Sequence, residues 1–174
     1  MTFWKNLLEA LKDLAYIFTH GKEEMPTIPV IVRPPEPSKT PTELLSDEAR
    51  KWLGRDASPL NSAPQELACA ESVSNIAHNA LGTLPANVIS TVVLCAILKQ
   101  SGRFRAILEP KEGCIVVSPT EGTNIGHTGI FITDSQIASN DSRNGLFESN
   151  YSFSSWIAYF KFRKGLHIYI FEPC

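Results

Sequence analysis

Residues 104–138, FRAILEPKEGCIVVSPTEGTNIGHTGIFITDSQIA, decide the fold that we predict. Short runs rich in β-branched and aromatic residues occur here, separated by Gly, Pro, Asn and Asp, at 104–108, 114–117, 128–133 and 136–138. Apolar runs of this length between turn residues are typical of β-strands. A further run of the same kind follows at 167–171. The second half of the chain is therefore expected to form a largely antiparallel sheet.

Upstream of residue 102, apolar residues recur at three- and four-residue intervals, which indicates helices. We expect three helices, at residues 42–53, in a segment that ends near residue 82, and at about 86–100. Thr42 is the expected N-cap of the first helix. Ser62 followed by Gln65 resembles a capping box, which would place Cys69 in the second turn of the next helix. Helices first and strands afterwards predict an α+β fold.

Two segments precede this domain, which we expect to span residues 42–174. Residues 1–24 have the apolar spacing of an amphipathic helix, and the charges that interrupt it argue against a cleavable signal peptide. Two interpretations of this helix stay open. It docks on its own domain or a sister subunit, or residues 1–20 contact a membrane surface, a virion or another protein. Residues 25–41 contain six prolines and predict a semi-rigid spacer.

The composition of the 174-residue chain is that of a globular protein, with 43% hydrophobic and 20% charged residues. Its formal net charge of -2 lacks the basic excess of a protein that coats nucleic acid, so no nucleic-acid partner is expected. The four cysteines lie far apart, at Cys69, Cys95, Cys114 and Cys174. No C-x-x-C pair occurs among them, so the sequence predicts neither a zinc site nor a disulfide scaffold.

Cys69 and His127 are the candidates for chemistry. A cysteine becomes a nucleophile when a helix N-terminus or an imidazolium lowers the pKa of its thiol. Cys69 lies near the start of a predicted helix, and His127 opens a predicted strand between Gly126 and Thr128. Such a pair suits acyl transfer if the fold brings it together. The alternative is that Cys69 is a small buried hydrophobe and that His127 is a surface residue at a strand edge.

Three blocks of the sequence resemble the pattern of papain-like peptidoglycan hydrolases of the CHAP and NlpC types. They are LACAESV at 67–73, GCIVVSP at 113–119 and GHTGIF at 126–131. In these families the nucleophile opens a helix, and a G-D-I-V-V-like strand precedes a G-H-V-G-I-like strand. The match covers roughly residues 60–174, with two departures: Cys114 replaces the usual aspartate, and Ala68 replaces a frequent aromatic residue. The resemblance implies a papain-like domain with helices packed on an antiparallel sheet.

The resemblance also implies roles for individual residues. Cys69 matches the nucleophile and His127 the general base. The third residue of the family site is a polar side chain on the next strand, which orients the imidazole, and Asn140 is the candidate. Asp141 and Ser139 stay open as alternatives, because a shift of one residue in register changes which side chain faces the cleft.

The implied reaction is cleavage of an amide bond in bacterial cell-wall peptidoglycan, within the peptide stem or crosslink or between sugar and stem. The Cys69 backbone N–H and one further donor, for which Gln65 is a candidate, would bind the oxyanion. No cofactor or metal is expected. A single catalytic domain without wall-binding repeats favours a phage-encoded lysin, an endolysin or a virion-associated enzyme. Such a lysin is made in the host cytoplasm or carried on a virion, and it acts at the cell wall. A secreted antibacterial amidase effector and a non-catalytic papain-like binding or structural module stay open as alternatives.

Other residues are given structural roles. His78 is expected to be solvated, and His167 to be structural within a strand. Cys95 and Cys114 are expected in the core, and Cys174 as an exposed terminal thiol. A set of aromatic side chains either lines a groove for sugar or peptide or belongs to the core: Phe147, Tyr151, Phe153, Trp156, Tyr159 and Phe160.

Overall fold

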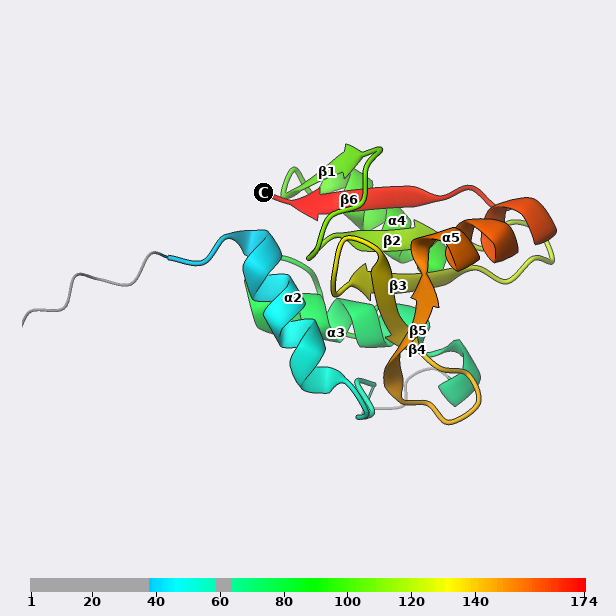
Figure 1. Ribbon diagram of the computed structural model, residues 1–174, viewed down its shortest axis with the longest axis horizontal. Coiled ribbons are helices and arrows are strands. Elements are labelled where there is room, and N and C mark those ends of the chain that lie inside the picture. Colours follow the sequence, from blue (N-terminus) through cyan, green and yellow to red (C-terminus); the bar gives the residue numbers. More distant parts are fainter. Residues whose placement is uncertain (1–37, 59–63) are drawn as a thin grey trace, which may run out of the picture. The chain divides into compact units, whose positions relative to one another are not determined.

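The computed structural model describes residues 38–58 and 64–174, within one compact unit, Ser38–Cys174. The predicted helix at 1–24 and the linker up to residue 37 lie outside the described residues. The unit is α+β with an antiparallel sheet, as predicted (Figure 1). Its helices are α2 (Pro41–Trp52), the 3-10 turn η1 (Gln65–Leu67), α3 (Cys69–Leu81), α4 (Thr91–Gln100), α5 (Phe153–Trp156) and the π-helix η2 (Ile157–Arg163). Its strands are β1 (Phe104–Ile107), β2 (Ile115–Ser118), β3 (His127–Phe131), β4 (Gln136–Asn140), β5 (Phe147–Ser152) and β6 (Tyr169–Pro173).

The sheet has six strands in the order β1-β6-β2-β3-β4-β5, and every neighbouring pair is antiparallel. The C-terminal strand β6 lies between β1 and β2, so the two ends of the sheet-forming segment are paired (Figure 1). Strands occur in all five predicted runs, with bounds that differ by one to two residues. Strand β5 was missed by the sequence analysis, because its polar residues, ESNYS, do not form an apolar run.

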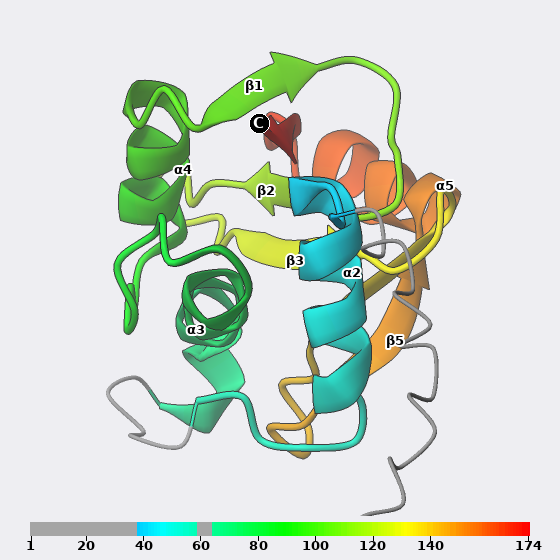
Figure 2. The same ribbon diagram turned by 90° about the vertical axis from the view of Figure 1, so that its left-hand side faces the viewer.

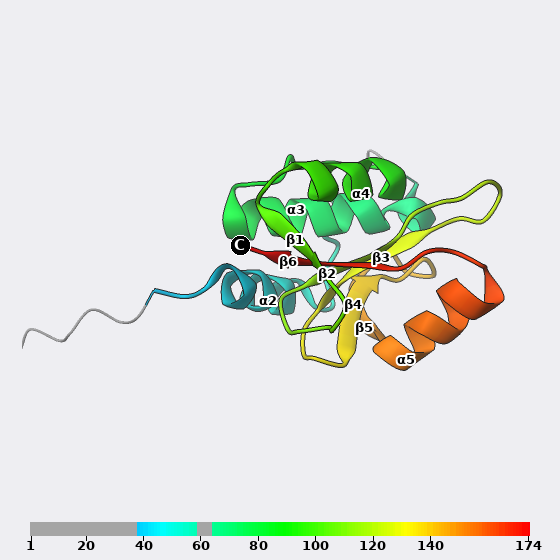
Figure 3. The same ribbon diagram turned by 90° about the horizontal axis from the view of Figure 1, so that it is seen from above.

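Alternate residues of the strands enter two separate cores, as the two-residue period of a strand requires. Ile115 and Val117 of β2 face α2, α3 and α4, whereas Val116 between them faces α5 and η2. Helices α3 and α4 lie side by side on one face of the sheet, and α5 lies on the opposite face (Figures 2 and 3). Because both faces are covered, the central strands read as nearly continuous apolar runs.

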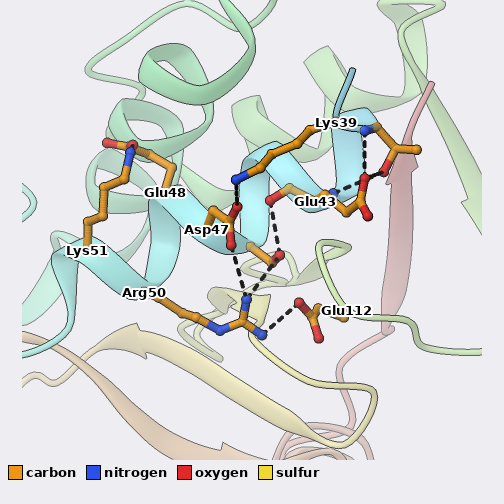
Figure 4. A network of polar contacts seen from close by, with 9 residues as sticks. Lys39, Glu43, Asp47, Glu48, Arg50, Lys51 and Glu112 are labelled. Atoms are coloured by element: carbon orange, nitrogen blue, oxygen red, sulfur yellow. Dashed lines mark hydrogen bonds and ion pairs between the residues drawn. The ribbon is translucent and has the colours of Figure 1, made fainter. Parts of the chain in front are cut away.

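Helix α2 begins earlier than predicted. Thr40, rather than Thr42, is its N-cap: the Thr40 hydroxyl accepts from the Glu43 backbone N–H, and the Glu43 carboxylate accepts from the Thr40 N–H at 2.7 Å. Pro41 is therefore the first helical residue, where a missing N–H costs nothing. Farther along α2, Arg50 reaches the loop before β2, donating to Glu112 Oε1 at 2.6 Å (Figure 4). The Arg50–Glu112 contact joins α2 to the loop before β2.

Helix α4 begins at Thr91 rather than near residue 86, and Ser90 caps it by accepting from the Val93 backbone N–H. The residues between α3 and α4 run over the surface as a loop. Among the helices that the structure describes, none is long and apolar enough to cross a membrane.

Candidate active site

Cys69 is the first residue of α3. The predicted capping box would have placed it in the second turn, which is wrong: the chain forms the short turn η1, and α3 starts only after Ala68. A helix leaves its first backbone N–H groups without helical partners, and Ala68 has no side chain that could cap them. The backbone N–H groups of Cys69 and Ala70 lie close enough to the Cys69 sulfur to lower the pKa of the thiol.

The thiol is nevertheless neutral at rest. Its residue is 5% exposed, and burial raises the pKa of Cys69 to about 11, outweighing the backbone N–H groups of Thr128, Ala70 and Cys69 itself, which lower it. The thiol lies 4.0 Å from the backbone carbonyl oxygen of Leu67, to which it donates weakly. A desolvated thiol of this kind needs a base to become a thiolate.

His127 opens β3, as predicted, and its place is set by close backbone packing. A Cβ on Gly126 would lie 2.1 Å from the Ser118 carbonyl oxygen, so no other residue fits before the histidine. The Gly126 N–H donates to the Thr120 hydroxyl at 2.9 Å. The Thr120 N–H in turn donates to the Thr91 hydroxyl, at the start of α4, at 3.1 Å. These hydrogen bonds connect the start of β3 to the start of α4.

Ser139 of β4 orients the imidazole. His127 Nε2 lies 3.0 Å from Ser139 Oγ, and that hydroxyl donates to Asn150 Oδ1 at 2.7 Å. The Asn150 amide nitrogen donates back to the Ser139 carbonyl, which fixes the orientation of the amide. A hydroxyl has one hydrogen, so Ser139 can only accept from Nε2–H. The neutral imidazole therefore keeps its lone pair on Nδ1.

Asn150 owes its position to a β-bulge. The pairing of β4 with β5 shifts between Ile137 and Ala138: Ile137 pairs with Tyr151 and Ala138 with Ser149, so Asn150 is skipped. Bulges of this kind redirect a side chain, and here the amide turns to Ser139. The sequence analysis missed Asn150 because nothing in the sequence marks a bulge there.

Asn140, the predicted third residue, does not contact the imidazole. Its amide nitrogen donates to the Gln65 carbonyl at 2.9 Å, because in β4 Asn140 and Ser139 point to opposite faces of the sheet. The alternative Ser139 takes the position instead. Asp141, the other alternative, pairs with Arg143, and its charge raises the pKa of His127 without a direct hydrogen bond.

Aromatic rings surround His127. The imidazole stacks against Trp156 and Phe160 with centroids 5.4 and 5.5 Å away, and Tyr151 meets it edge-on at 5.7 Å. Burial, with a smaller contribution from the Lys164 charge, lowers the pKa of His127 to about 4, so the imidazole is neutral at pH 7. A neutral imidazole is the form that can accept a proton.

Cys69 and His127 line one cavity of about 470 Å³. Its walls include side chains of α4 and the loop before it, of the loop before β3, of β5 and of η2 and the residue after it: Ile89, Val92, Ile125, Tyr151, Tyr159, Phe160 and Lys164 are among them. The predicted aromatic set is thus divided. Tyr151, Tyr159 and Phe160 line the cavity, whereas Phe147 and Trp156 are fully buried. A smaller cavity of about 210 Å³ borders His127 and Tyr151 on the side of Asn140.

The structure confirms the predictions for three cysteines and for His78. Cys95 and Cys114 are buried and Cys174 is exposed. His78 is exposed, with its Nδ1 2.7 Å from the Leu84 carbonyl oxygen. The prediction for His167 is wrong: this residue is exposed and lies before β6 rather than within a strand, with its Nδ1 2.8 Å from Glu121 Oε1. Gln65 does not line the cavity, because its amide donates to the Asn144 carbonyl at 2.6 Å. Within residues 38–58 and 64–174, no cluster of His, Cys, Asp and Glu could hold a metal ion.

The arrangement defines a cysteine–histidine site in a cavity of an α+β domain. Its parts are a thiol at a helix start, an imidazole whose lone pair is on Nδ1, and a serine–asparagine pair behind the imidazole. No model of a known protein family matches the chain, and a search of curated proteins finds no match.

Proposed function

We propose that residues 42–174 form a papain-like cysteine hydrolase that cleaves an amide bond of bacterial peptidoglycan, as a phage lysin does. The main support is that Cys69 and His127 line the same cavity while Ser139 holds the Nε2 side of the imidazole. This leaves Nδ1 as the proton acceptor, the role that a general base needs. The choice of peptidoglycan as substrate rests on the resemblance of the three sequence blocks.

In the proposed mechanism the Cys69 thiol gives its proton to His127 Nδ1 as the sulfur attacks the amide carbonyl carbon. The S–H bond must turn from the Leu67 carbonyl to the imidazole for this step. The negative charge that develops on the carbonyl oxygen is stabilised by the backbone N–H groups at the start of α3. The imidazolium then protonates the leaving amine, and water hydrolyses the thioester with His127 again as base.

A non-catalytic papain-like module is the second candidate. One observation favours it: a 5% exposed thiol whose pKa lies near 11, beside an imidazole whose pKa lies near 4, is also what an inert core cysteine would show. The two candidates differ in what happens when Cys69 is replaced. The module keeps its function with alanine at this position, whereas the hydrolase loses all turnover.

The deciding experiment is mass spectrometry of fragments released from purified peptidoglycan by the wild type, Cys69→Ala and Cys95→Ala. Cys95 is the matched control, since it is also a buried helical cysteine but does not line the cavity. We expect identical new fragments from the wild type and Cys95→Ala, and none from Cys69→Ala. The fragment masses identify the bond. Absence of fragments with the wild type on several wall types would overturn the hydrolase proposal.

A further inference from the structure

Among the residues that the structure describes, Lys164 carries the only positive charge on the wall of the cavity at pH 7. Of the described residues that line it, only His127 and Lys164 can be cationic, and His127 is neutral because its pKa lies near 4. None of the described lining residues is an Asp or Glu. A cavity with one cation and no anion on its described wall favours a negatively charged ligand.

The Lys164 side chain is held in place rather than free in solvent. Its Nζ donates to the Ile125 carbonyl at 2.8 Å and lies 5.2 and 5.6 Å from the ring centroids of Tyr159 and Phe160. The backbone is also fixed, since the Lys164 carbonyl accepts from the Asn124 amide at 3.0 Å. These contacts keep the ammonium group beside the cavity and orient it.

This ammonium group can donate further hydrogen bonds, beyond the one it makes to the Ile125 carbonyl. An ammonium has three N–H donors, and the Ile125 carbonyl takes one of them. In the part of the chain that the structure describes, Lys164 makes no ion pair with a carboxylate. A half-buried cation is most stable when an anion completes its shell, and a carboxylate of the substrate would do so.

We propose that Lys164 is a specificity-determining residue that binds a free carboxylate of the substrate next to the scissile amide. The inference rests on the proposed function and names the chemical class of its substrate: an amide flanked by an ionised carboxylate. The rest of the wall suits a small aliphatic side chain on the same substrate residue, because Ile89, Val92 and Ile125 are about half exposed around the cavity. Amino-acid residues of peptidoglycan stems that keep a free carboxyl group have this chemistry.

The test uses soluble muropeptides in two forms, native and with their free carboxylates converted to carboxamides by carbodiimide and ammonia. Rates of amide cleavage are measured for the wild type, Lys164→Gln, Lys164→Arg and Lys161→Gln. Lys161 is the matched control, because it lies one helical turn earlier on η2, is exposed and does not line the cavity. The ratio of native to amidated kcat/KM within each protein does not depend on the fraction that is folded.

We expect the wild type and Lys161→Gln to cleave native muropeptides at least about tenfold faster than amidated ones, as a charge-assisted hydrogen bond allows. The ratio should fall to about one in Lys164→Gln and be largely retained in Lys164→Arg. Equal rates of the wild type on both substrates, or a Lys164→Gln variant that slows without losing the preference, would overturn the role of Lys164 alone. Absence of any wild-type cleavage overturns the proposed function instead.

Discussion

At the scale of single residues, the Ser139 hydroxyl sets the tautomer of His127, because its hydrogen points to Asn150. Because Ser139 gives its hydrogen to Asn150, it can only accept from His127 Nε2–H. Two neutral amino-acid side chains thus do what a carboxylate does in many triads: they select one tautomer of the imidazole. Without a carboxylate in contact, nothing raises the pKa of His127 enough to offset burial, and it stays near 4.

In the proposed mechanism, removing the Ser139 hydroxyl should impair His127 as the general base. In Ser139→Ala the imidazole loses its fixed tautomer, and we expect kcat to fall on the order of 100-fold. Ser149→Ala is the matched control, since Ser149 is an exposed residue of β5 and makes no contact with His127. Nitrogen-15 chemical shifts of His127 should show Nε2–H in the wild type and a mixture of tautomers in Ser139→Ala. A wild-type imidazole protonated at Nδ1 would contradict this account.

At the scale of elements, two close approaches of backbone require glycine, one beside the site and one against α2. Gly126 passes against the Ser118 carbonyl just before His127. Gly113, just before β2, passes against the start of α2: a Cβ there would lie 2.1 Å from the Thr42 carbonyl oxygen. Glycine is required at both positions because backbone atoms cannot give way as flexible side chains do.

Gly113→Ala should therefore be more costly than an alanine at an open turn. Gly122 is the matched control: its φ of +58° is similar to the +79° of Gly113, but no atom lies within 4 Å of a Cβ at Gly122. Both changes incur left-handed strain, and only Gly113→Ala adds a clash. We expect Gly113→Ala to lower the free energy of unfolding by about 1–3 kcal/mol more than Gly122→Ala, measured by urea denaturation. Equal losses would show that α2 moves away freely.

At the scale of the whole molecule, the sheet separates two cores, and the site lies beside the start of β3, where the two cores meet. His127 belongs to the aromatic side, with Trp156 and Phe160, whereas Cys69 belongs to the helical side. The imidazole is thereby placed in an apolar environment that disfavours its charged form. The same packing that builds the second core makes the stability of the protein depend on pH.

The free energy of unfolding should decrease as pH falls from 7.5 to 5. The unfolded chain protonates His127 near pH 6.5, whereas the folded protein does so only near pH 4. Between these values the unfolded state binds more protons, which destabilises the folded state by about 2 kcal/mol at pH 5. Urea denaturation of the wild type and of His127→Gln at both pH values isolates this contribution. The variant should show a smaller decrease; the same decrease in both proteins would assign the effect to other groups.

The amino-acid sequence alone was sufficient to predict the α+β class, the helices followed by strands, and His127 at the start of a strand. These features depend on local periodicity and on turn residues, which are readable within a short window. The resemblance of the three sequence blocks implied that a polar residue after 136–138 orients the imidazole, with Asn140 as the candidate and Ser139 and Asp141 as alternatives; the structure places Ser139 there. The choice between Asn140 and Ser139 depends on the register of β4, and a shift of one residue exchanges the faces.

Only the tertiary structure showed the bulge that turns Asn150 to Ser139 and the place of Lys164 beside the cavity. It also settled the start of α3 at Cys69, for which the capping-box pattern and the resemblance gave different positions. Each depends on contacts between segments far apart in the chain. Asn150 is placed by the pairing of β4 with β5, and Lys164 by hydrogen bonds to the loop before β3. The pKa values of Cys69 and His127 also required the fold, because desolvation by burial, their largest cause, arises only when the helices and the sheet pack together.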